Sequence, residues 1–336
     1  MVNTRFIQNC SSVISTTGAM PSGELVVCTD TRAYHHPSMF IAYPGAKHNP
    51  LDMIGPLLDK GCPLVIFQQD ATNDSLVANL AKKFPKTCFV SVKDAVTFSQ
   101  ELAVLQARDW QSKGKTIFAI SGSNGKTTHK EMLGHLLRAK FGSKAVATEK
   151  NNNNHLGVPL TLFNLNAESE VCVLELGSNH PGEIKVLCDI AHPNAGLVTN
   201  IGATHLEFFG TEKNVFDEEG FLYHSIKQTT GGKGFFLQNM DDEFLKTFPR
   251  HEGTKTFSLK PGADYQITPE KDGVKISGKL AVTLDNPYVT GAHNKQNMAV
   301  SWIIASTLFP DSKEIFTAAA SDFRPTKNRS EWCEHQ

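Results

Sequence analysis

The sequence has no excess of charge of either sign. Its 336 residues include 33 Lys and Arg and 34 Asp and Glu, so the formal net charge is −1. Proteins that bind nucleic acid or anionic membranes through bulk charge carry a clear positive excess, and this balance argues against that class. A charged fraction of 20% beside an apolar fraction of 40% indicates a globular chain with a buried core.

Long apolar runs and paired cysteines are also missing. No run approaches the ~18–20 apolar residues that span a bilayer, and the opening segment MVNTRFIQNCSSVIS lacks the apolar stretch of a secretory signal. The seven cysteines are an odd number and contain no Cys-x-x-Cys pair, which argues against a disulfide framework and a structural zinc site. These absences predict a soluble, cytoplasmic protein. Its length of 336 residues predicts two or three domains, at about 100–200 residues per domain.

The first part of the chain, residues 1–112, has the pattern of a small α/β domain. Short apolar runs predict strands at Leu25–Thr29, Met39–Ala42, Leu64–Phe67 and Cys88–Val92. Helical spacing is present over Leu51–Lys60 and from Asp94 to Gln111. The polar segment that follows, residues 112–115, has the composition of a domain junction.

The second part, residues 113–322, alternates predicted strands and helices. The strands are Thr116–Ile120, Val171–Leu176 and Ala195–Ile201, and the helices are Thr127–Lys140, Pro181–Ile190 and Asn294–Leu308. We place Pro181 at an early position of its helix and expect Trp302, Ile303 and Ile304 in the core. The alternation predicts a doubly wound, mostly parallel sheet whose ligands bind beyond the carboxyl ends of its strands. Residues 262–289 instead predict added β-hairpins.

The strongest chemical signal is the segment GSNGKTT at Gly122–Thr128, between a predicted strand and a predicted helix. Backbone N–H groups of such a turn and the positive end of the helix suit a phosphate. Lys126 can neutralise β- and γ-phosphate oxygens, and the Thr127 hydroxyl can bind Mg²⁺. The usual first glycine is replaced by Ile120, and a chance glycine-rich turn before a helix is the alternative.

Polar groups after the other predicted strands extend this signal. Glu175 ends an apolar strand and would face Mg²⁺ if that strand neighbours the phosphate loop, although a solvated strand end is the alternative. His205 follows the third strand and could bind a metal through a neutral imidazole, but a lone His there is more often structural. The segments 151–154 (NNNN) and 291–297 (GAHNKQN) could bind a polar substrate and a base, or serve only as a loop and a helix cap.

Taken together, these segments resemble the Mur ligase family, whose members couple ATP to amide-bond formation in peptidoglycan precursors through an acyl-phosphate. The matching strings occur in family order across about residues 116–305 and read GSNGKTTHKEM, TEKNNNNHLGVPLTL, LELGSNHPGEI, VTNIGATHLEFFG and TGAHNKQNMA. The strongest resemblance is to the members that join D-alanyl-D-alanine to a UDP-linked muramyl tripeptide. A weaker resemblance to the first domain of the family covers Thr29–Arg32 and Met39–Ala42.

The resemblance implies ATP and Mg²⁺ as cofactors and assigns residues to each ligand. It gives ATP binding to Gly122, Ser123, Asn124, Gly125, Lys126, Thr127, Thr128, His293, Asn294, Asn297 and Arg329. The implied metal ligands are Thr127, Glu175, His205 and Glu219. The implied catalytic residues are Lys126, Glu175, His205 and Glu219. It gives the muramyl-peptide substrate to Thr31, Arg32, Asn153, Asn154, Ser178, Asn179 and His180.

The resemblance also implies the domain roles and the partners. Residues 1–112 would bind the UDP-linked substrate, residues 113–322 would bind ATP, and residues 323–336 would begin a linker to a third domain. The implied partners are the UDP-linked muramyl peptide, D-alanyl-D-alanine and a third ligase domain in cis or in trans, with no nucleic acid and no membrane span.

Three features depart from the family pattern. The family places a carbamylated lysine fourteen residues after the metal-site His, where this chain has Glu219, and we expect Glu219 to replace the carbamate. The segment Pro44–Asp52 replaces an Asp-Gly-His-like sequence that contacts the uridine nucleotide, and the chain ends about where a C-terminal domain begins. A non-catalytic module that binds ATP or the precursor, and a relative of the folate-glutamate ligases, are the alternative functions.

Overall fold

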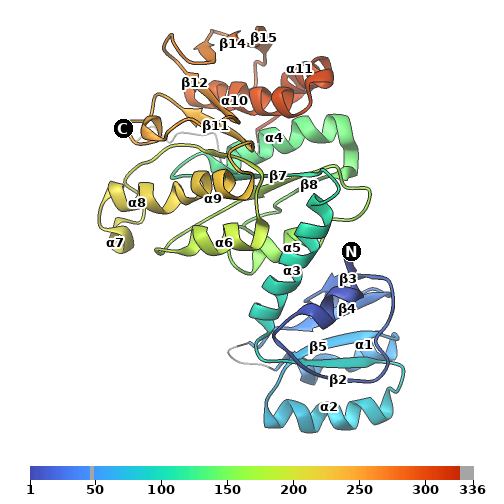
Figure 1. Ribbon diagram of the computed structural model, residues 1–336. Coiled ribbons are helices and arrows are strands. Elements are labelled where there is room, and N and C mark those ends of the chain that lie inside the picture. The colour runs from blue at the N-terminus through green and yellow to red at the C-terminus, as the bar shows by residue number, and fades with distance from the viewer. Residues whose placement is uncertain (46–48, 326–336) are drawn as a thin grey trace, which may run out of the picture. The chain divides into compact units, whose positions relative to one another are not determined.

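The computed structural model describes residues 1–45 and 49–325, which form two compact units (Figure 1). Unit 1 contains Met1–Gly114 together with His155–Ala167, and unit 2 contains Lys115–Asn154 and the described residues from Glu168 onward. The predicted ATP contact Arg329 and part of the segment Pro44–Asp52 lie outside the described residues. The functional domain boundaries proposed from the sequence stay a prediction.

Unit 1 is built on a six-stranded sheet in the order β1-β3-β4-β5-β6-β2. The strands are β1 (Val2–Asn3), β2 (Val13–Thr17), β3 (Glu24–Cys28), β4 (Ser38–Ala42), β5 (Leu64–Gln68) and β6 (Cys88–Val92). Strands β3 to β6 are parallel, and β1 and β2 close the edges in antiparallel pairs. All four strands predicted in this part are confirmed. Mostly apolar residues fill both faces of β4, β5 and β6, whereas β3 buries only Leu25 and Cys28 completely.

The helices of unit 1 are α1 (Gly55–Asp59), α2 (Ala71–Lys83), α3 (Ala95–Gln111) and α5 (Gly157–Leu162). The predicted helix over Leu51–Lys60 is wrong as one element, because it divides into a 3₁₀ turn, Pro50–Met53, and helix α1. Pro56 explains the division. A proline has no backbone N–H to continue a helix but fits the first turn of a new one.

Unit 2 is built on a nine-stranded sheet in the order β15-β14-β13-β12-β11-β10-β7-β9-β8. Its strands are β7 (Thr116–Ser121), β8 (Ala145–Ala147), β9 (Val171–Glu175), β10 (Ala195–Val198), β11 (Phe235–Asn239), β12 (Thr254–Ser258), β13 (Tyr265–Pro269), β14 (Gly273–Gly278) and β15 (Val282–Asp285). The pairs from β8 to β13 are parallel, and β13, β14 and β15 form antiparallel hairpins. This arrangement confirms the predicted mostly parallel sheet with an added hairpin region.

Helices pack on both faces of this sheet. The helices of unit 2 are α4 (Lys126–Phe141), α6 (Glu183–Ala191), α7 (Leu206–Phe209), α8 (Glu212–Glu219), α9 (Phe221–Thr229), α10 (Ala292–Leu308) and α11 (Lys313–Asp322), of which the short α7 packs against α8. Ala195 and Leu197 of β10 point into the core beneath α4 and α10, whereas Gly196 between them faces Ile226 of α9. A Cβ on Gly196 would lie 2.7 Å from that Ile226 side chain, so the glycine allows the close approach of α9.

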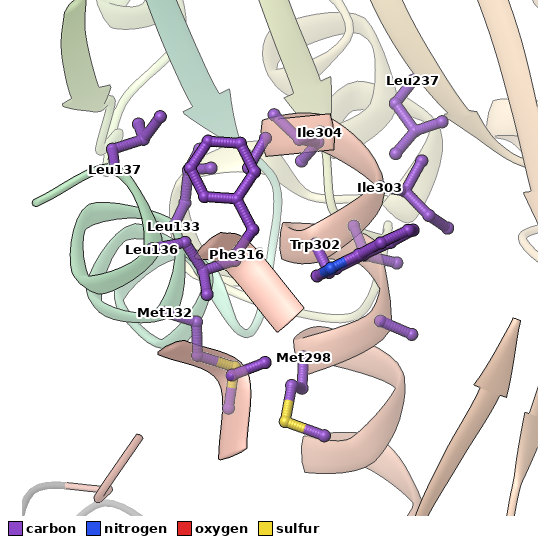
Figure 2. Close-up of a cluster of buried hydrophobic side chains, with 14 of the residues drawn as sticks. Met132, Leu133, Leu136, Leu137, Leu237, Met298, Trp302, Ile303, Ile304 and Phe316 are labelled. Carbon is purple, nitrogen blue, oxygen red and sulfur yellow. The ribbon is translucent and has the colours of Figure 1, made fainter. Parts of the chain in front are cut away.

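The core of unit 2 joins three helices to the sheet. Figure 2 shows side chains of α4, α10, α11 and β11 packed together, among them Met132, Leu133, Leu136, Leu137, Leu237, Met298, Trp302, Ile303, Ile304 and Phe316. The predicted core positions Trp302, Ile303 and Ile304 are all buried, which confirms that prediction. Burying a large apolar side chain of this kind stabilises the fold by roughly 1.5–3 kcal/mol.

Helix α6 begins later than the sequence suggests. Gly182 is its N-cap in a left-handed conformation, with φ of 91°, and Pro181 precedes the helix. The prediction of Pro181 at an early helical position is therefore wrong. The N–H groups of Gly182 and Ile184 both donate to the carboxylate of Glu218 at 2.7 Å, which fixes the start of the helix. None of the described helices has the length and apolar character needed to cross a bilayer.

Candidate functional site

Three neighbouring strands of unit 2 end at one edge of the sheet. Strand β7 lies between β10 and β9, and the register pairs Ile120 with Glu175 and Ser121 with Val198. The carboxyl ends of parallel strands are where open α/β sheets bind ligands. The topology therefore brings together the loop after β7, the end of β9 and the segment after β10, as the sequence predicts.

The phosphate-type loop after β7 is held by the segment after β10. Gly122 has φ of 122°, and a Cβ there would lie 2.8 Å from the Thr199 nitrogen, so only glycine fits. The Thr199 hydroxyl donates to the Asn124 carbonyl at 2.7 Å. The Ser123 N–H donates to the Asn200 carbonyl, and the Asn124 N–H donates to the Asn200 side chain, both at 2.9 Å. The sequence interpretation missed Thr199 and Asn200, whose only signal is their place directly after a strand.

The start of helix α4 offers N–H donors that the helix itself does not use. The N–H groups of Gly122, Ser123 and Asn124 already bind acceptors within the protein. The first helical bond runs from the His129 N–H to the Gly125 carbonyl, so the amides from Gly125 to Thr128 have no acceptor inside the helix. The Lys126 ammonium bends back to donate to the Gly122 and Ser123 carbonyls. A helix end of this kind with a lysine beside it suits a phosphate group.

Glu175 is buried at the end of β9, directly beside the loop. The Thr127 hydroxyl and the Asn153 amide each donate to its Oε1 at 3.0 Å. Its Oε2 is buried and has no hydrogen-bond partner among the described residues, and the Lys130 ammonium lies 3.7 Å from it. A carboxylate with one unsatisfied oxygen, next to a hydroxyl, fits the oxygen ligands that Mg²⁺ prefers.

Glu219 contacts the first glycine of the loop and is also buried. Its Oε2 accepts the Gly122 N–H at 2.8 Å, and its backbone carbonyl accepts the Ser121 hydroxyl at 2.9 Å. Burial raises the pKa of this carboxyl, while the nearby Lys126 and the Gly122 N–H act in the opposite direction. Glu219 thus contacts the backbone of the phosphate loop, and its replacement of a carbamate at a metal stays a prediction.

His205 is exposed and adopts a left-handed conformation, with φ of 51°, at the N-cap of α7. In the described part of the chain, no three His, Cys, Asp or Glu side chains form a group that could hold a metal ion. Glu175, His205 and Glu219 are therefore not gathered into one ligand set by the protein alone. Their shared metal role stays a prediction, whereas Thr127 and Glu175 are in direct contact.

The start of α10 comes close to the phosphate loop through Asn297. A Cβ placed on Gly125 would lie 3.8 Å from the Asn297 side-chain nitrogen. Asn294 lies one turn earlier, and its amide donates to the Thr290 carbonyl at 3.1 Å, while His293 is exposed. Asn297 is thus at the loop, and the adenine contacts predicted for these residues stay predictions.

The residues predicted to bind the substrate are spread over both units. Asn153 is tied to Glu175, and the buried Ser178 hydroxyl has no hydrogen-bond partner within residues 1–45 and 49–325. The N–H groups of Asn179 and His180 donate to Glu183, at 2.6 and 3.1 Å, in the turn before α6. Asn154 is exposed. In unit 1, Thr31 and Arg32 lie in a 3₁₀ turn, where Arg32 pairs with Asp30 at 2.8 Å.

Unit 1 has a polar cavity that the sequence interpretation missed. It encloses about 280 Å³ at the carboxyl ends of β4 and β5, and Asn49, Gln68 and Asn73 are among its lining residues. The Asn73 amide donates to the Gln68 carbonyl at 2.8 Å and accepts the Asn49 amide at 2.6 Å. These side chains come from a loop (Asn49), the end of β5 (Gln68) and the first turn of α2 (Asn73), so they leave no periodic signal in the sequence.

Comparison with known proteins finds similarity to Mur ligases both in a family model and in individual sequences. The family model for the Mur ligase middle domain matches residues 120–305. The chain is 26% identical over 334 residues to the UDP-N-acetylmuramoyl-tripeptide–D-alanyl-D-alanine ligase of Bacillus subtilis, covering 97% of this chain and 69% of that protein. It is 28% identical over 289 residues to the ligase of the same name from Haemophilus influenzae, covering 82% of this chain and 58% of that protein.

Solved structures show the same fold. A crystal structure of MurF from Acinetobacter baumannii superposes with a TM-score of 0.76 at 23% identity, covering 99% of this chain and 71% of that one. The structure of the MurF ligase from Thermotoga maritima in complex with ADP gives a TM-score of 0.71 at 24% identity, covering 90% of this chain and 66% of that one.

Proposed function

Because this chain belongs to the Mur ligase family, we propose that it is an ATP-dependent ligase that forms an amide bond in a peptidoglycan precursor. The proposed substrates are a UDP-linked muramyl tripeptide, which supplies the carboxylate, and D-alanyl-D-alanine, which supplies the amine. The names of the relatives from Bacillus subtilis and Haemophilus influenzae support this choice. A cytoplasmic location, where ATP is supplied, is part of the same proposal.

The observation that carries the proposal is the contact between Thr127 and Glu175 beside Lys126 and the first amides of α4, which have no acceptor inside the helix. These groups would hold the phosphates of ATP, with Asn294 and Asn297 toward the base. Thr127 and Glu175 would hold Mg²⁺, which when bound offsets the repulsion between the phosphates and the attacking carboxylate. Orienting the reactants and excluding water would supply most of the rate.

A phosphate-release assay tests the proposal. We expect release that requires ATP, the UDP-linked muramyl tripeptide and D-alanyl-D-alanine together, and its loss in Lys126→Ala. The assay is run with the chain alone and with the C-terminal part of a MurF relative added in trans, since the chain spans 69% of the Bacillus subtilis protein. Nucleotide binding without stimulation by any substrate combination, in both arms, would contradict the proposal.

A further inference from the structure

Lys130 is a buried lysine with no part in the function proposed so far. It lies on α4, one turn after Lys126, and only 6% of its surface is exposed. Its ammonium group is 3.7 Å from Oε2 of Glu175, whose side chain is equally buried. A buried charge is retained only where it is compensated, so each of these side chains depends on the other.

Lys130 compensates the charge of Glu175 without a hydrogen bond to it. A separation of 3.7 Å exceeds the about 2.7–3.2 Å of a hydrogen bond. Thr127 and Asn153 both donate to Oε1, whereas Oε2 has no hydrogen-bond partner in the part of the chain that the structure describes. Lys130 therefore neutralises the carboxylate and leaves one of its oxygens without a hydrogen bond.

The loop already carries two lysines before any ligand binds. The Lys126 ammonium donates to carbonyls of the loop, and the Lys130 ammonium lies 3.7 Å from Glu175. A divalent cation at Thr127 and Glu175 would add two positive charges next to a buried ammonium group, where the effective dielectric constant is low. The phosphates of a nucleotide would supply the missing negative charge.

We propose that Lys130 is a positioning residue that substitutes for the metal charge beside Glu175 and opposes divalent-cation binding until a nucleotide is present. The inference rests on the proposed nucleotide site but not on ligase turnover. Lys130 thereby couples the two ligands, and by linkage each raises the affinity for the other. When no metal is bound, the Glu175 carboxylate keeps its position because the Lys130 ammonium lies beside it.

Titration of the nucleotide-free chain with Mn²⁺, followed by the electron paramagnetic resonance signal of free Mn²⁺, tests this role. We expect Lys130→Met to bind Mn²⁺ at least about tenfold more tightly than the wild type, because the repulsion is removed. Lys185→Met, which removes an exposed lysine paired with Asp189, is the matched control and should behave as the wild type. ADP should tighten Mn²⁺ binding strongly in the wild type and only weakly in Lys130→Met. Equal affinity of wild type and Lys130→Met for Mn²⁺ would overturn the inference.

Two further measurements keep the inference testable if Lys130→Met is less stable than the wild type. Lys130→Arg keeps the charge and should retain the weak Mn²⁺ binding of the wild type, so tighter binding there would also overturn the inference. Lys130→Met should unfold at a lower temperature, because Glu175 loses its compensating charge. Added Mn²⁺ should raise its Tm more than that of the wild type, and an equal response would count against the role. Failure of phosphate release with these Mn²⁺ results intact would contradict only the proposed function.

Discussion

Two adjacent glutamates at the end of α8 hold two different parts of unit 2. Glu218 binds the N–H groups of Gly182 and Ile184 at the start of α6, and Glu219 binds the N–H of Gly122 in the phosphate loop. Consecutive residues of a helix point about 100° apart, so one helix end can reach both sites. The segment FDEEG is polar in sequence, yet both carboxylates are buried because their backbone donors come from distant parts of the chain.

Replacing Glu219 tests its contact with the loop. We expect Glu219→Ala to weaken the affinity for a fluorescent ADP analogue by about tenfold or more, because a hydrogen bond to a charged group is worth about 1.5–3 kcal/mol. The variant also removes a carboxyl group near Lys126, and that change alone would favour an anionic ligand, so weaker binding reports the lost contact with the loop. Asp217→Asn is the matched control, since Asp217 is exposed on the same helix and pairs with Lys213. Unchanged affinity in Glu219→Ala would show that the loop keeps its shape without this carboxylate.

Gly122 offers a second test at the residue scale. In Gly122→Ala the new methyl group would meet Thr199 while φ stays in the left-handed half of backbone space. We expect loss of ADP binding and a drop in Tm, because the bonds of the loop to Thr199 and Asn200 cannot all persist. Gly142→Ala is the matched control: it has φ of 57° at the end of α4 but open space around it. That control should lose about 1–3 kcal/mol of stability from backbone strain and keep ADP binding. Equal effects of the two variants would refute the steric argument.

At the scale of elements, α4 connects the phosphate loop to the core through its packing against α10. His129 is buried at this interface, with its Nδ1 3.4 Å from the Ser301 hydroxyl. Burial lowers the pKa of His129 from 6.5 to about 4. The folded protein therefore resists protonation at a pH where the unfolded chain accepts the proton, and acid should loosen the element that carries the loop.

The pH dependence of stability follows from this shift. The stabilising effect of neutral His129 is complete above pH 6.5 and is lost as the pH falls toward about 4. We expect the free energy of unfolding in urea to fall by about 2 kcal/mol more between pH 7 and pH 5 in the wild type than in His129→Gln. His293→Gln, an exposed position in the same unit, should follow the wild type. Parallel pH profiles for wild type and His129→Gln would contradict the assignment.

The strands and helices that carry the site could be predicted because their signals are local. An apolar strand, a glycine turn and an amphipathic helix lie within a few tens of residues, as from Thr116 to Phe141. The contacts of Glu219 and Asn200 with the loop could not be predicted, because they join residues that are 75 or more positions apart in the sequence. The start of α6 was misplaced for a similar reason. The backbone of Gly182 is fixed by Glu218, which lies 36 residues away.

At the scale of the whole molecule, unit 1 is assembled from two separate stretches of chain. The segment His155–Ala167 belongs to it although unit 2 flanks this segment on both sides. The Met1 ammonium donates to the Phe163 carbonyl at 2.7 Å, and the Gln106 amide donates to the Leu165 carbonyl at 2.9 Å. Val158, Leu162 and Leu165 are fully buried. Helix α5 is therefore part of the core of unit 1, and a cut after Gly114 would expose that core.

This assembly predicts how fragments of unit 1 behave. Residues 1–114 joined by a short Gly/Ser linker to residues 155–167 should unfold in one cooperative transition. Residues 1–114 alone should be less stable by several kcal/mol, since each buried apolar side chain of α5 is worth about 1.5–3 kcal/mol. Urea denaturation followed by tryptophan fluorescence measures the difference, because Trp110 of α3 is buried in this unit. The joined fragment with Leu162→Ala is the matched control and should lose about 2–5 kcal/mol. Equal stability of the fragments with and without residues 155–167 would mean that α5 adds nothing to the core of unit 1.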